Sequence, residues 1–295
     1  MLNERIVVPD IRVYKNNYYF KILPKSNIKI KKPRKIDKVL VFDLDETLGS
    51  FHQLVILWNL LEDVNKNQNN FNTLLDLYPE FMREGILKIL KYIIKKKKKR
   101  ECDKLYIYTN SIYSPEIPNL LTKYFQYKLK EETIIFDKVI SAFKINNKII
   151  ETGRTTNNKT HHDFIQCAVL PEKTEICFID DSYHEKMNHE KVYYIQPSPY
   201  FYYLTVDTIV KRFVNSNLYT GSLDETQLYN TINDGHYIIP FPQNNDQHKK
   251  VFQKMIYYIK DFFYLTHNKT KTRKLRTHIG NFTRKRIINS RMPLG

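Results

Sequence analysis

Residues 39–49 read Val-Leu-Val-Phe-Asp-Leu-Asp-Glu-Thr-Leu-Gly, an apolar run followed by two carboxylates and a hydroxyl at alternate positions. Its four leading apolar residues predict a buried parallel strand, and open α/β sheets bind ligands beyond the carboxyl ends of their strands. Because alternate side chains of an extended chain face the same way, Asp43, Asp45 and Thr47 are expected to converge while Leu44 packs behind them. A strand followed by a polar turn would use the same residue types. The pattern nevertheless favours a phosphoryl-transfer site.

Two later segments repeat this arrangement of an apolar strand followed by polar side chains. Residues 105–108 form an apolar run that ends in Thr109, and residues 175–179 form another that ends in Asp180 and Asp181. Parallel strands separated by helical segments are typical of a doubly wound α/β sheet, in which such strand ends share one edge. The sequence therefore predicts that these hydroxyl and carboxylate groups lie near residues 43–47.

The segment Asp-Leu-Asp-Glu-Thr-Leu at 43–48 resembles the first motif of the haloacid dehalogenase superfamily. Glu46 makes it similar to the branch of RNA polymerase II C-terminal-domain phosphatases and NLI-interacting-factor-like phosphatases. The resemblance implies that Asp43 is the nucleophile and Asp45 the general acid and base. An aspartyl-phosphate would split hydrolysis into two easier displacements, and proton transfer by a second carboxyl is worth ~10²–10⁴-fold in rate.

The same resemblance assigns the phosphate-binding groups. Thr109 occupies the second motif, whose hydroxyl donates to a phosphate oxygen. Lys159, which lies 21 residues before Asp180, fits the cation of the third motif, although the spacing is slightly longer than usual. Arg154 is the alternative, and an ordinary surface lysine at 159 is also open.

The carboxylates of the fourth motif imply a Mg²⁺ site. Mg²⁺ takes hard oxygen ligands and binds through one or two carboxylates plus substrate phosphate. Asp43, the backbone carbonyl of Asp45 and one of Asp180 or Asp181 would supply the protein ligands. The resemblance favours Asp181 as the direct ligand, with Asp180 acting through water or supporting Lys159; the sequence alone leaves that order open.

The expected fold is an α/β, Rossmann-like haloacid dehalogenase fold: a doubly wound parallel sheet with a small hairpin insertion and a helical, basic C-terminal extension. The resemblance covers somewhat more than half of the chain. The hairpin is expected at residues 144–149, around Asn-Asn. The predicted parts are a basic lead-in over 1–35, the phosphatase-like domain over 36–214, a partly helical extension over 215–266 and a basic, disordered tail over 267–295.

Local patterns predict several further elements. One short strand is expected from Ile6, Val8 and the cluster Tyr18-Tyr19-Phe20, and a helix is expected over residues 51–64. Residues 65–72 are polar enough to predict a surface loop. A second helix is expected to open at Tyr78-Pro79 and to end in the six basic residues 95–100. That run suits a solvated helix end, with a nuclear-targeting or phosphate-attracting patch as the alternative.

The net charge of +17 is unevenly distributed. Residues 1–38 sum to +8 and residues 267–295 to +9, so residues 39–266 sum to zero. Nucleic acid is therefore a possible partner of the basic ends. The richness in Lys, Asn, Ile, Tyr and Phe also fits A/T-rich coding, as in a copy carried by a large DNA virus.

Three unclustered cysteines predict neither a zinc site nor a disulfide framework. No apolar run approaches the ~18–20 residues that cross a bilayer. We expect an intracellular protein of the cytoplasm or nucleus, in the host cell if the gene is viral, with no membrane partner.

The favoured function is a Mg²⁺-dependent protein serine/threonine phosphatase, with a phosphoprotein such as the RNA polymerase II C-terminal tail as its partner and substrate. One alternative is a nucleic-acid end phosphatase of the same superfamily. The other is a catalytically idle phosphatase fold kept as a binding module.

Overall fold

The structure is a computed structural model of the 295-residue chain. It describes residues 10–14, 18–22, 37–113, 116–221, 224–234 and 245–267. The chain divides into two compact units, residues 1–255 and residues 256–295. The predictions for Ile6, Val8 and the tail beyond His267 lie outside the described residues.

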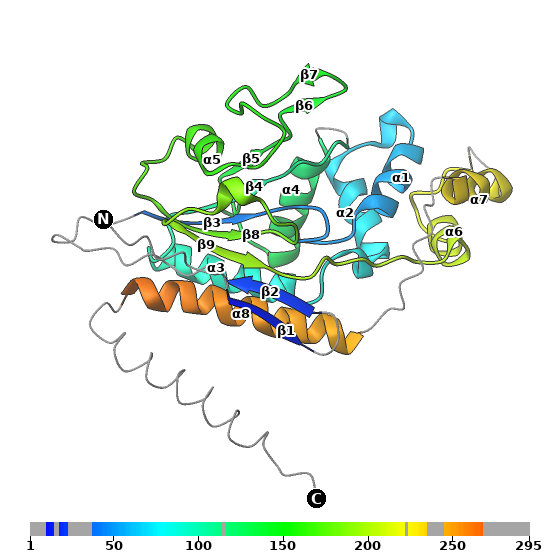
Figure 1. Cartoon of the computed structure of the whole chain (residues 1–295). Helices are drawn as coiled ribbons and strands as arrows, with labels where there is room; N and C mark the ends of the chain where they lie inside the picture. The colour runs from blue at the N-terminus through cyan, green and yellow to red at the C-terminus, as the bar shows by residue number, and fades with distance from the viewer. Residues whose placement is uncertain are drawn as a thin grey trace, which may run out of the picture. The chain divides into compact units, whose positions relative to one another are not determined.

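A seven-stranded sheet in the order β1-β2-β9-β8-β3-β4-β5 forms the centre of the first unit (Figure 1). Its five strands from β9 to β5 run parallel. They are β3 (Lys38–Phe42), β4 (Lys104–Tyr108), β5 (Lys138–Ile140), β8 (Glu175–Ile179) and β9 (Val192–Gln196). The apolar residues of β3, β4 and β8 are almost fully buried, as expected of parallel strands covered on both faces. The α/β, Rossmann-like part of the prediction is therefore confirmed.

Helices cover both faces of this sheet because the chain reverses its direction of winding. From β3 the chain passes through α3 (Ile86–Lys98) to β4 and through α4 (Ile117–Leu129) to β5. It then crosses back through α5 (His161–Ala168) to β8. Right-handed crossovers in opposite directions place their helices on opposite faces. The winding therefore reverses between β3 and β8, and doubly wound sheets bind ligands at such a reversal.

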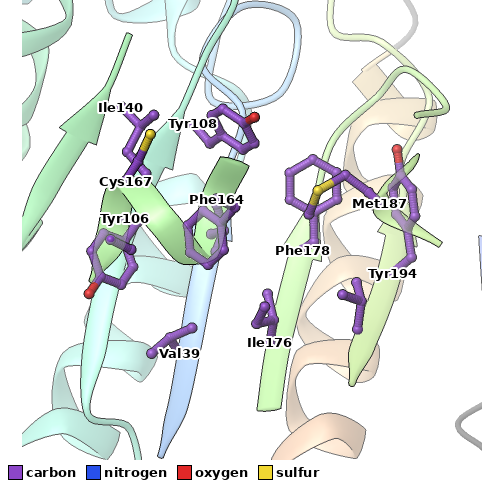
Figure 2. Packing of buried hydrophobic residues seen from close by; sticks show 13 residues of the cluster. Val39, Tyr106, Tyr108, Ile140, Phe164, Cys167, Ile176, Phe178, Met187 and Tyr194 are labelled. Carbon is purple, nitrogen blue, oxygen red and sulfur yellow. The ribbon is translucent and has the colours of Figure 1, made fainter. Parts of the chain in front are cut away.

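The core beneath α5 shows how the strands alternate their side chains. Val39 and Val41 of β3 join Tyr106 of β4 and Phe178 of β8 in one buried cluster with Phe164 of α5 (Figure 2). The ring of Phe164 meets that of Tyr106 edge-on at 5.4 Å. This packing fixes the position of α5, which follows directly after the predicted cation Lys159.

The amino-terminal segment forms two strands where we expected one. β1 (Asp10–Tyr14) and β2 (Tyr18–Ile22) make an antiparallel hairpin, and β2 pairs antiparallel with β9. A hairpin can extend a sheet edge without a crossover helix, because antiparallel strands need only a short turn. The described part of the lead-in therefore belongs to the sheet.

The segment between β3 and α3 folds into α1 (His52–Leu60), η1 (Asp63–Asn65), α2 (Gln68–Leu77) and η2 (Pro79–Phe81). The prediction of a surface loop over 65–72 is wrong. Phe71 is fully buried, with its ring edge-on to Trp58 at 5.2 Å, and Asn67 caps the helix by accepting from the Asn70 amide. One well-placed aromatic residue and one N-cap outweigh the polar composition.

Two strands, β6 (Lys144–Ile145) and β7 (Lys148–Ile149), form a short antiparallel hairpin around Asn146 and Asn147, which both have positive φ. After β9 the chain continues through α6 (Val206–Val214), α7 (Glu225–Asp234) and α8 (Asn245–His267). Among the described residues, no helix combines the length and apolarity that a membrane span requires.

Candidate active site

The predicted site lies at the carboxyl ends of β3 and β8, where the winding of the chain reverses. Phe42 and Ile179 are register partners at the ends of these neighbouring strands, so Asp43 and Asp180 follow side by side. The Asp43 amide donates to the Ile179 carbonyl at 2.9 Å, which ties the two ends together. Thr109 follows β4, the other neighbour of β3, and its side chain is buried. The sheet thus brings three of the predicted strand ends to one edge.

Lys159 is the cation of this site. Its Nζ donates to Asp43 Oδ1 and, at 2.7 Å, to Asp180 Oδ2, and the side chain is only 2% exposed. Burial alone would lower the pKa of Lys159, but the charges of Asp180 and Asp43 raise it above its ordinary value. The ammonium group is therefore permanently charged and held between two carboxylates.

The start of α5 determines where Lys159 lies. Thr160 is the N-cap: its hydroxyl accepts from the Asp163 amide at 3.0 Å, and its own amide donates to the Tyr108 hydroxyl at 3.2 Å. Asp163 in turn accepts from the amide and the hydroxyl of Thr155, which folds the preceding loop back onto the helix. These capping bonds fix the chain on both sides of Lys159.

Arg154, the alternative cation, has a different role. Its guanidinium donates to the carbonyls of Thr109 and Ser141 and to the Asn110 side chain at 2.8–3.1 Å. Further bonds reach the carbonyls of Asn157 and Asn158. Arg154 therefore joins the loops after β4 and β5, whereas Lys159 is the residue that contacts the two carboxylates.

Asp180 and Asp181 have different partners. Asp180 Oδ1 accepts from the Ser182 amide at 2.9 Å, and Oδ2 lies 2.7 Å from Lys159 and 3.2 Å from His184 Nε2. Asp181 Oδ1 accepts from the Thr47 hydroxyl at 2.9 Å. Both oxygens of Asp180 are thus engaged by protein donors, while Asp181 is oriented by Thr47 from the first motif.

Burial affects the pKa of Asp43, Asp180 and Asp181. It raises the pKa of Asp43, against the opposing charge of Lys159, and it raises the pKa of Asp181, where Asp180 adds to the effect. Burial also opposes ionisation of Asp180, but the charge of Lys159 and the hydrogen bond from His184 hold its pKa below the ordinary value. Asp180 is therefore the most firmly ionised carboxylate of the cluster.

Asp45 has an environment suited to proton transfer. Burial raises its pKa to about 6, although the Ser111 hydroxyl and the charge of Lys159 lower it. Ser111 lies close enough to exert this effect without a hydrogen bond of normal geometry: Asp45 Oδ1 and Ser111 Oγ are both buried and without a partner. Unsatisfied buried polar atoms are rare in native proteins, so both atoms are available to a bound molecule.

The carboxylates of Asp43, Asp180 and Asp181 form a group that fits a metal ion. One oxygen from each lies within 4.8 Å of the others. Hard, anionic oxygens are the donors that Mg²⁺ takes in proteins. Within the part of the chain that the structure describes, Lys159 is the one lysine paired with the group. Three carboxylates therefore face a single ammonium charge there, and a divalent cation would offset the surplus negative charge.

The loop after β3 is not the extended chain that the sequence analysis assumed. Glu46 has φ of 55°, and the Leu48 amide donates to the Leu44 carbonyl at 2.8 Å, so the chain turns back within five residues. Thr47 faces Asp181, whose carboxylate lies within 4.8 Å of that of Asp43, so the turn still brings the Thr47 hydroxyl to this carboxylate group. Leu44 is fully buried, as expected.

Arg83, which the sequence analysis did not single out, holds this loop from behind. It is 4% exposed and donates to the carbonyls of Thr47 and Ser198 at 2.6 and 2.9 Å, and to that of Glu46. The guanidinium also lies 5.3 Å from the centroid of the Tyr200 ring. Burial lowers the pKa of Arg83 to about 10. It therefore stays charged at neutral pH.

Comparison with known proteins identifies no relative. No family model matches the chain, and neither a curated protein nor a solved structure is significantly similar to it. The function therefore has to be argued from the site itself.

Besides Arg83, sequence reasoning missed His184, whose ring nitrogen contacts Asp180. It lies four residues after Asp180, a spacing that could have drawn attention to it. No comparable signal marks Arg83, because its partners are backbone carbonyls. His161, another histidine near the start of α5, is half-buried; its ring stacks on that of His189 with centroids 3.8 Å apart, and its Nε2 has no hydrogen-bond partner.

Proposed function

We propose that this protein is a Mg²⁺-dependent phosphomonoesterase of the haloacid dehalogenase type that forms an aspartyl-phosphate on Asp43. The observation that carries the proposal is the bridge from Lys159 to Asp43 and Asp180, at the carboxyl ends of two adjacent central strands. A fixed ammonium group beside a nucleophilic carboxylate can stabilise charge that develops on a transferring phosphoryl group. The site then needs a proton donor on the leaving-group side, and Asp45 supplies one.

Asp43, Asp181 and the backbone carbonyl of Asp45 would hold the metal. Asp181 is the better carboxylate because Asp180 is bound by the Lys159 ammonium, His184 and the Ser182 amide, whereas Asp181 accepts from the neutral hydroxyls of Thr47 at 2.9 Å and Ser182 at 3.4 Å. Bound there, Mg²⁺ would screen the repulsion between the Asp43 carboxylate and a phosphate dianion. Asp180 then acts as the support that keeps Lys159 in place.

The reaction follows from the remaining side chains. A carboxylate oxygen of Asp43 attacks phosphorus in line, and the bond from phosphorus to the substrate oxygen breaks. Asp45 gives its proton to that leaving oxygen and later takes one from the water that hydrolyses the aspartyl-phosphate. Lys159 and the Thr109 hydroxyl hold the equatorial phosphoryl oxygens during both displacements. Ser111 Oγ, buried and unpaired near Asp45, can donate to the same group.

The proposed substrates are phosphoserine and phosphothreonine in proteins, including the repeats of an RNA polymerase II C-terminal tail. A site without a separate cap domain over it would favour a macromolecular substrate. The described segment 46–108 contains no separate cap domain: α1 and α2 pack on one another and on α4 and α7 within the first compact unit. The nucleic-acid end phosphatase remains the competing prediction. It rests on the basic ends of the chain, most of which lie outside the described residues.

Activity measurements test the proposal directly. Purified protein should release phosphate from p-nitrophenyl phosphate with Mg²⁺ and not with EDTA, and Asp43→Asn should abolish turnover. Asp207→Asn, an exposed carboxylate in the first turn of α6, is the matched control and should retain it. Beryllium fluoride should form an adduct on Asp43. If turnover does not depend on Mg²⁺ and Asp43→Asn has no effect, the hypothesis of a catalytically inactive binding module would be favoured instead.

The substrate class needs a separate comparison. A phosphoserine peptide and a 3′-phosphorylated DNA oligonucleotide should be offered at equal concentration. We expect the larger kcat/KM with the peptide. A preference for the DNA end would replace the protein substrate while leaving the chemistry of Asp43 intact.

A further inference from the structure

The exposed face of α3 carries a row of lysines that the proposed chemistry does not use. Lys88, Lys91, Lys95 and Lys99, here called the α3 lysine stripe, follow one another at three- and four-residue steps. This spacing places them on one side of a helix. The opposite side is the buried stripe of Ile86, Ile89, Leu90, Ile93 and Ile94. The four ammonium groups therefore project from a helix whose orientation is fixed by its core packing.

The stripe differs from three neighbouring lysines of the basic run, Lys96, Lys97 and Lys98, which are neutralised locally. Lys96 pairs with Glu101 at 2.5 Å, Lys97 with Asp137 at 2.6 Å and Lys98 with Glu131 at 2.7 Å. No ion pair joins the four stripe lysines to any acidic side chain in the part of the chain that the structure describes. The prediction of a solvated helix end therefore describes the stripe lysines better than Lys96, Lys97 and Lys98, which are paired with acidic side chains.

Residues 39–266 have zero net charge, but their basic residues are unevenly distributed. Residues 86–104 alone hold nine Lys or Arg and two Asp or Glu. A coding bias toward lysine raises the number of lysines on every surface, but it does not remove acidic residues from one helix face. The stripe spans about 17 Å, since eleven residues each rise ~1.5 Å. A straight row of uncompensated charge of this length is complementary to a regular row of anions.

We propose that the α3 lysine stripe binds the phosphate backbone of a nucleic-acid duplex. The four described positions offer charge and no apolar side chain for insertion into a membrane. Single-strand binding surfaces stack bases on exposed aromatic rings. The aromatic residue of α3, Tyr92, is half-buried and lies 5.6 Å from Lys96 Nζ, so it offers no such platform. A duplex, which presents ordered phosphates and needs neither feature, fits the stripe best.

The stripe also has a defined direction relative to the candidate site. Arg83, which donates to the loop carrying Asp45, precedes α3 by three residues, so the Lys88 end is the nearer one. At the other end, Asp103 donates its amide to the Lys38 carbonyl at the start of β3. Near Lys88, the ring of Phe252 from the first compact unit lies 5.8 Å from Nζ. A duplex along α3 would therefore extend toward the edge of the sheet that carries the site.

Salt-dependent binding of the full-length chain tests this proposal. The stripe variant carries Lys→Gln at 88, 91, 95 and 99. The control variant has the same net charge and carries Lys→Gln at four exposed lysines on other elements: Lys123, Lys144, Lys173 and Lys186. Both variants keep the basic ends of the chain. Fluorescence anisotropy with a 20-base-pair duplex should be measured from about 50 to 300 mM salt, a range over which phosphate contacts change affinity strongly.

We expect the slope of log K against log salt to fall by about 3 to 4 in the stripe variant, because each phosphate contact contributes ~0.9. In the control variant, the slope should change by less than ~0.9, which is the contribution of one phosphate contact. Duplex should also protect the four stripe lysines from acetylation in the wild-type chain. Circular dichroism verifies that both variants are folded, and turnover of p-nitrophenyl phosphate reports the proposed site independently.

Two outcomes would overturn the proposal. Equal slopes for the wild type and the stripe variant would mean that duplex binding, if present, belongs to other basic residues. Loss of binding to anionic phospholipid vesicles in the stripe variant, with duplex binding unchanged, would assign the stripe to a membrane surface. Neither outcome depends on whether Asp43 is a nucleophile.

Discussion

Arg83 Nε donates to the Thr47 carbonyl at 2.6 Å, across 36 residues of sequence. The same side chain reaches the Glu46 and Ser198 carbonyls, so one buried guanidinium joins the loop after β3 to the loop after β9. A guanidinium has donors in a fixed planar fork, which an ammonium group lacks. The orientation of the candidate catalytic loop therefore depends on an arginine that touches none of the predicted site side chains.

Replacing Arg83 tests this positioning role. Arg83→Lys keeps the charge but cannot serve three carbonyls, and we expect kcat for p-nitrophenyl phosphate to fall about tenfold to a hundredfold, since misplacement near 1 Å can cost ~10²-fold. KM should change less than kcat. Arg212→Lys is the control: Arg212 pairs with both oxygens of Glu80 at 2.8–2.9 Å and contacts no residue of the loop. Equal losses of kcat in both variants would contradict a specific role for Arg83.

Gly49 is a position where the loop has no room for a side chain. A Cβ there would lie 2.3 Å from the Phe81 carbonyl oxygen and 2.4 Å from the Phe51 ring. We expect Gly49→Ala to lower the free energy of unfolding by about 2–3 kcal/mol, a typical cost of overpacking, and to reduce activity. Gly221 has φ of 75° but open space around its Cβ position. Gly221→Ala should therefore cost only ~1 kcal/mol of backbone strain and leave activity intact. Urea unfolding measures both changes.

Lys159 should be more important to stability than any exposed lysine. Lys159→Met leaves Asp43 and Asp180 buried without their shared cation, and removing one partner of a buried pair costs about 3–5 kcal/mol. The double variant Lys159→Met/Asp180→Asn should regain part of this loss because it also removes a carboxylate. Neither variant should hydrolyse p-nitrophenyl phosphate. If the loss of unfolding free energy in the double variant equals the sum of the losses in Lys159→Met and Asp180→Asn, the two side chains are not coupled.

Metal binding should stabilise the fold. Mg²⁺ at a hundred times its dissociation constant adds ~2.7 kcal/mol, which corresponds to a rise in Tm of about 5–10 °C for a domain of this size. We expect that rise in the wild type and in Asp207→Asn, and little of it in Asp181→Asn. Differential scanning fluorimetry with Mg²⁺ and with EDTA gives the comparison. A full Mg²⁺ effect in Asp181→Asn would exclude this carboxylate as the ligand.

The pair of Glu80 and Arg212 predicts a small dependence of stability on pH. The hydrogen bond from Arg212 holds the pKa of Glu80 below its ordinary value of 4.5, against the effect of burial. A lowered folded-state pKa contributes stability above the unfolded value, and that stability disappears as pH falls through the folded value. Wild type should therefore have a higher Tm than Glu80→Gln at pH 7, by less than the equivalent of ~1 kcal/mol because the pair is partly exposed. The difference should shrink as pH falls below 4.5 and disappear below the lowered folded-state pKa of Glu80. A difference in Tm that does not change with pH would instead be explained by the shape of the side chain and not by its charge.

Local pattern was sufficient to predict the strands and the carboxylates that follow them. An apolar run bounded by polar residues reports burial directly, so β3, β4 and β8 were predicted to within one residue at each end. The α2 helix was missed because its buried face depends on Phe71 meeting Trp58, which is a contact between elements. The turn at Glu46 was missed for a related reason: its partners, Arg83 and the Tyr200 amide, lie far along the chain.

By itself, the sequence determined that this chain places Asp43, Asp45, Thr109, Asp180 and Asp181 after apolar strands, since strand and strand end are local features. Only the tertiary structure decided that Lys159, and not Arg154, contacts Asp43, 116 residues away. It also decided that Asp180 supports this cation while Thr47 orients Asp181, and that the lysines of α3 form a separate row. The physical reason is that hydrogen bonds and ion pairs depend on distances of about 3 Å, which are fixed only when the helices pack onto the sheet.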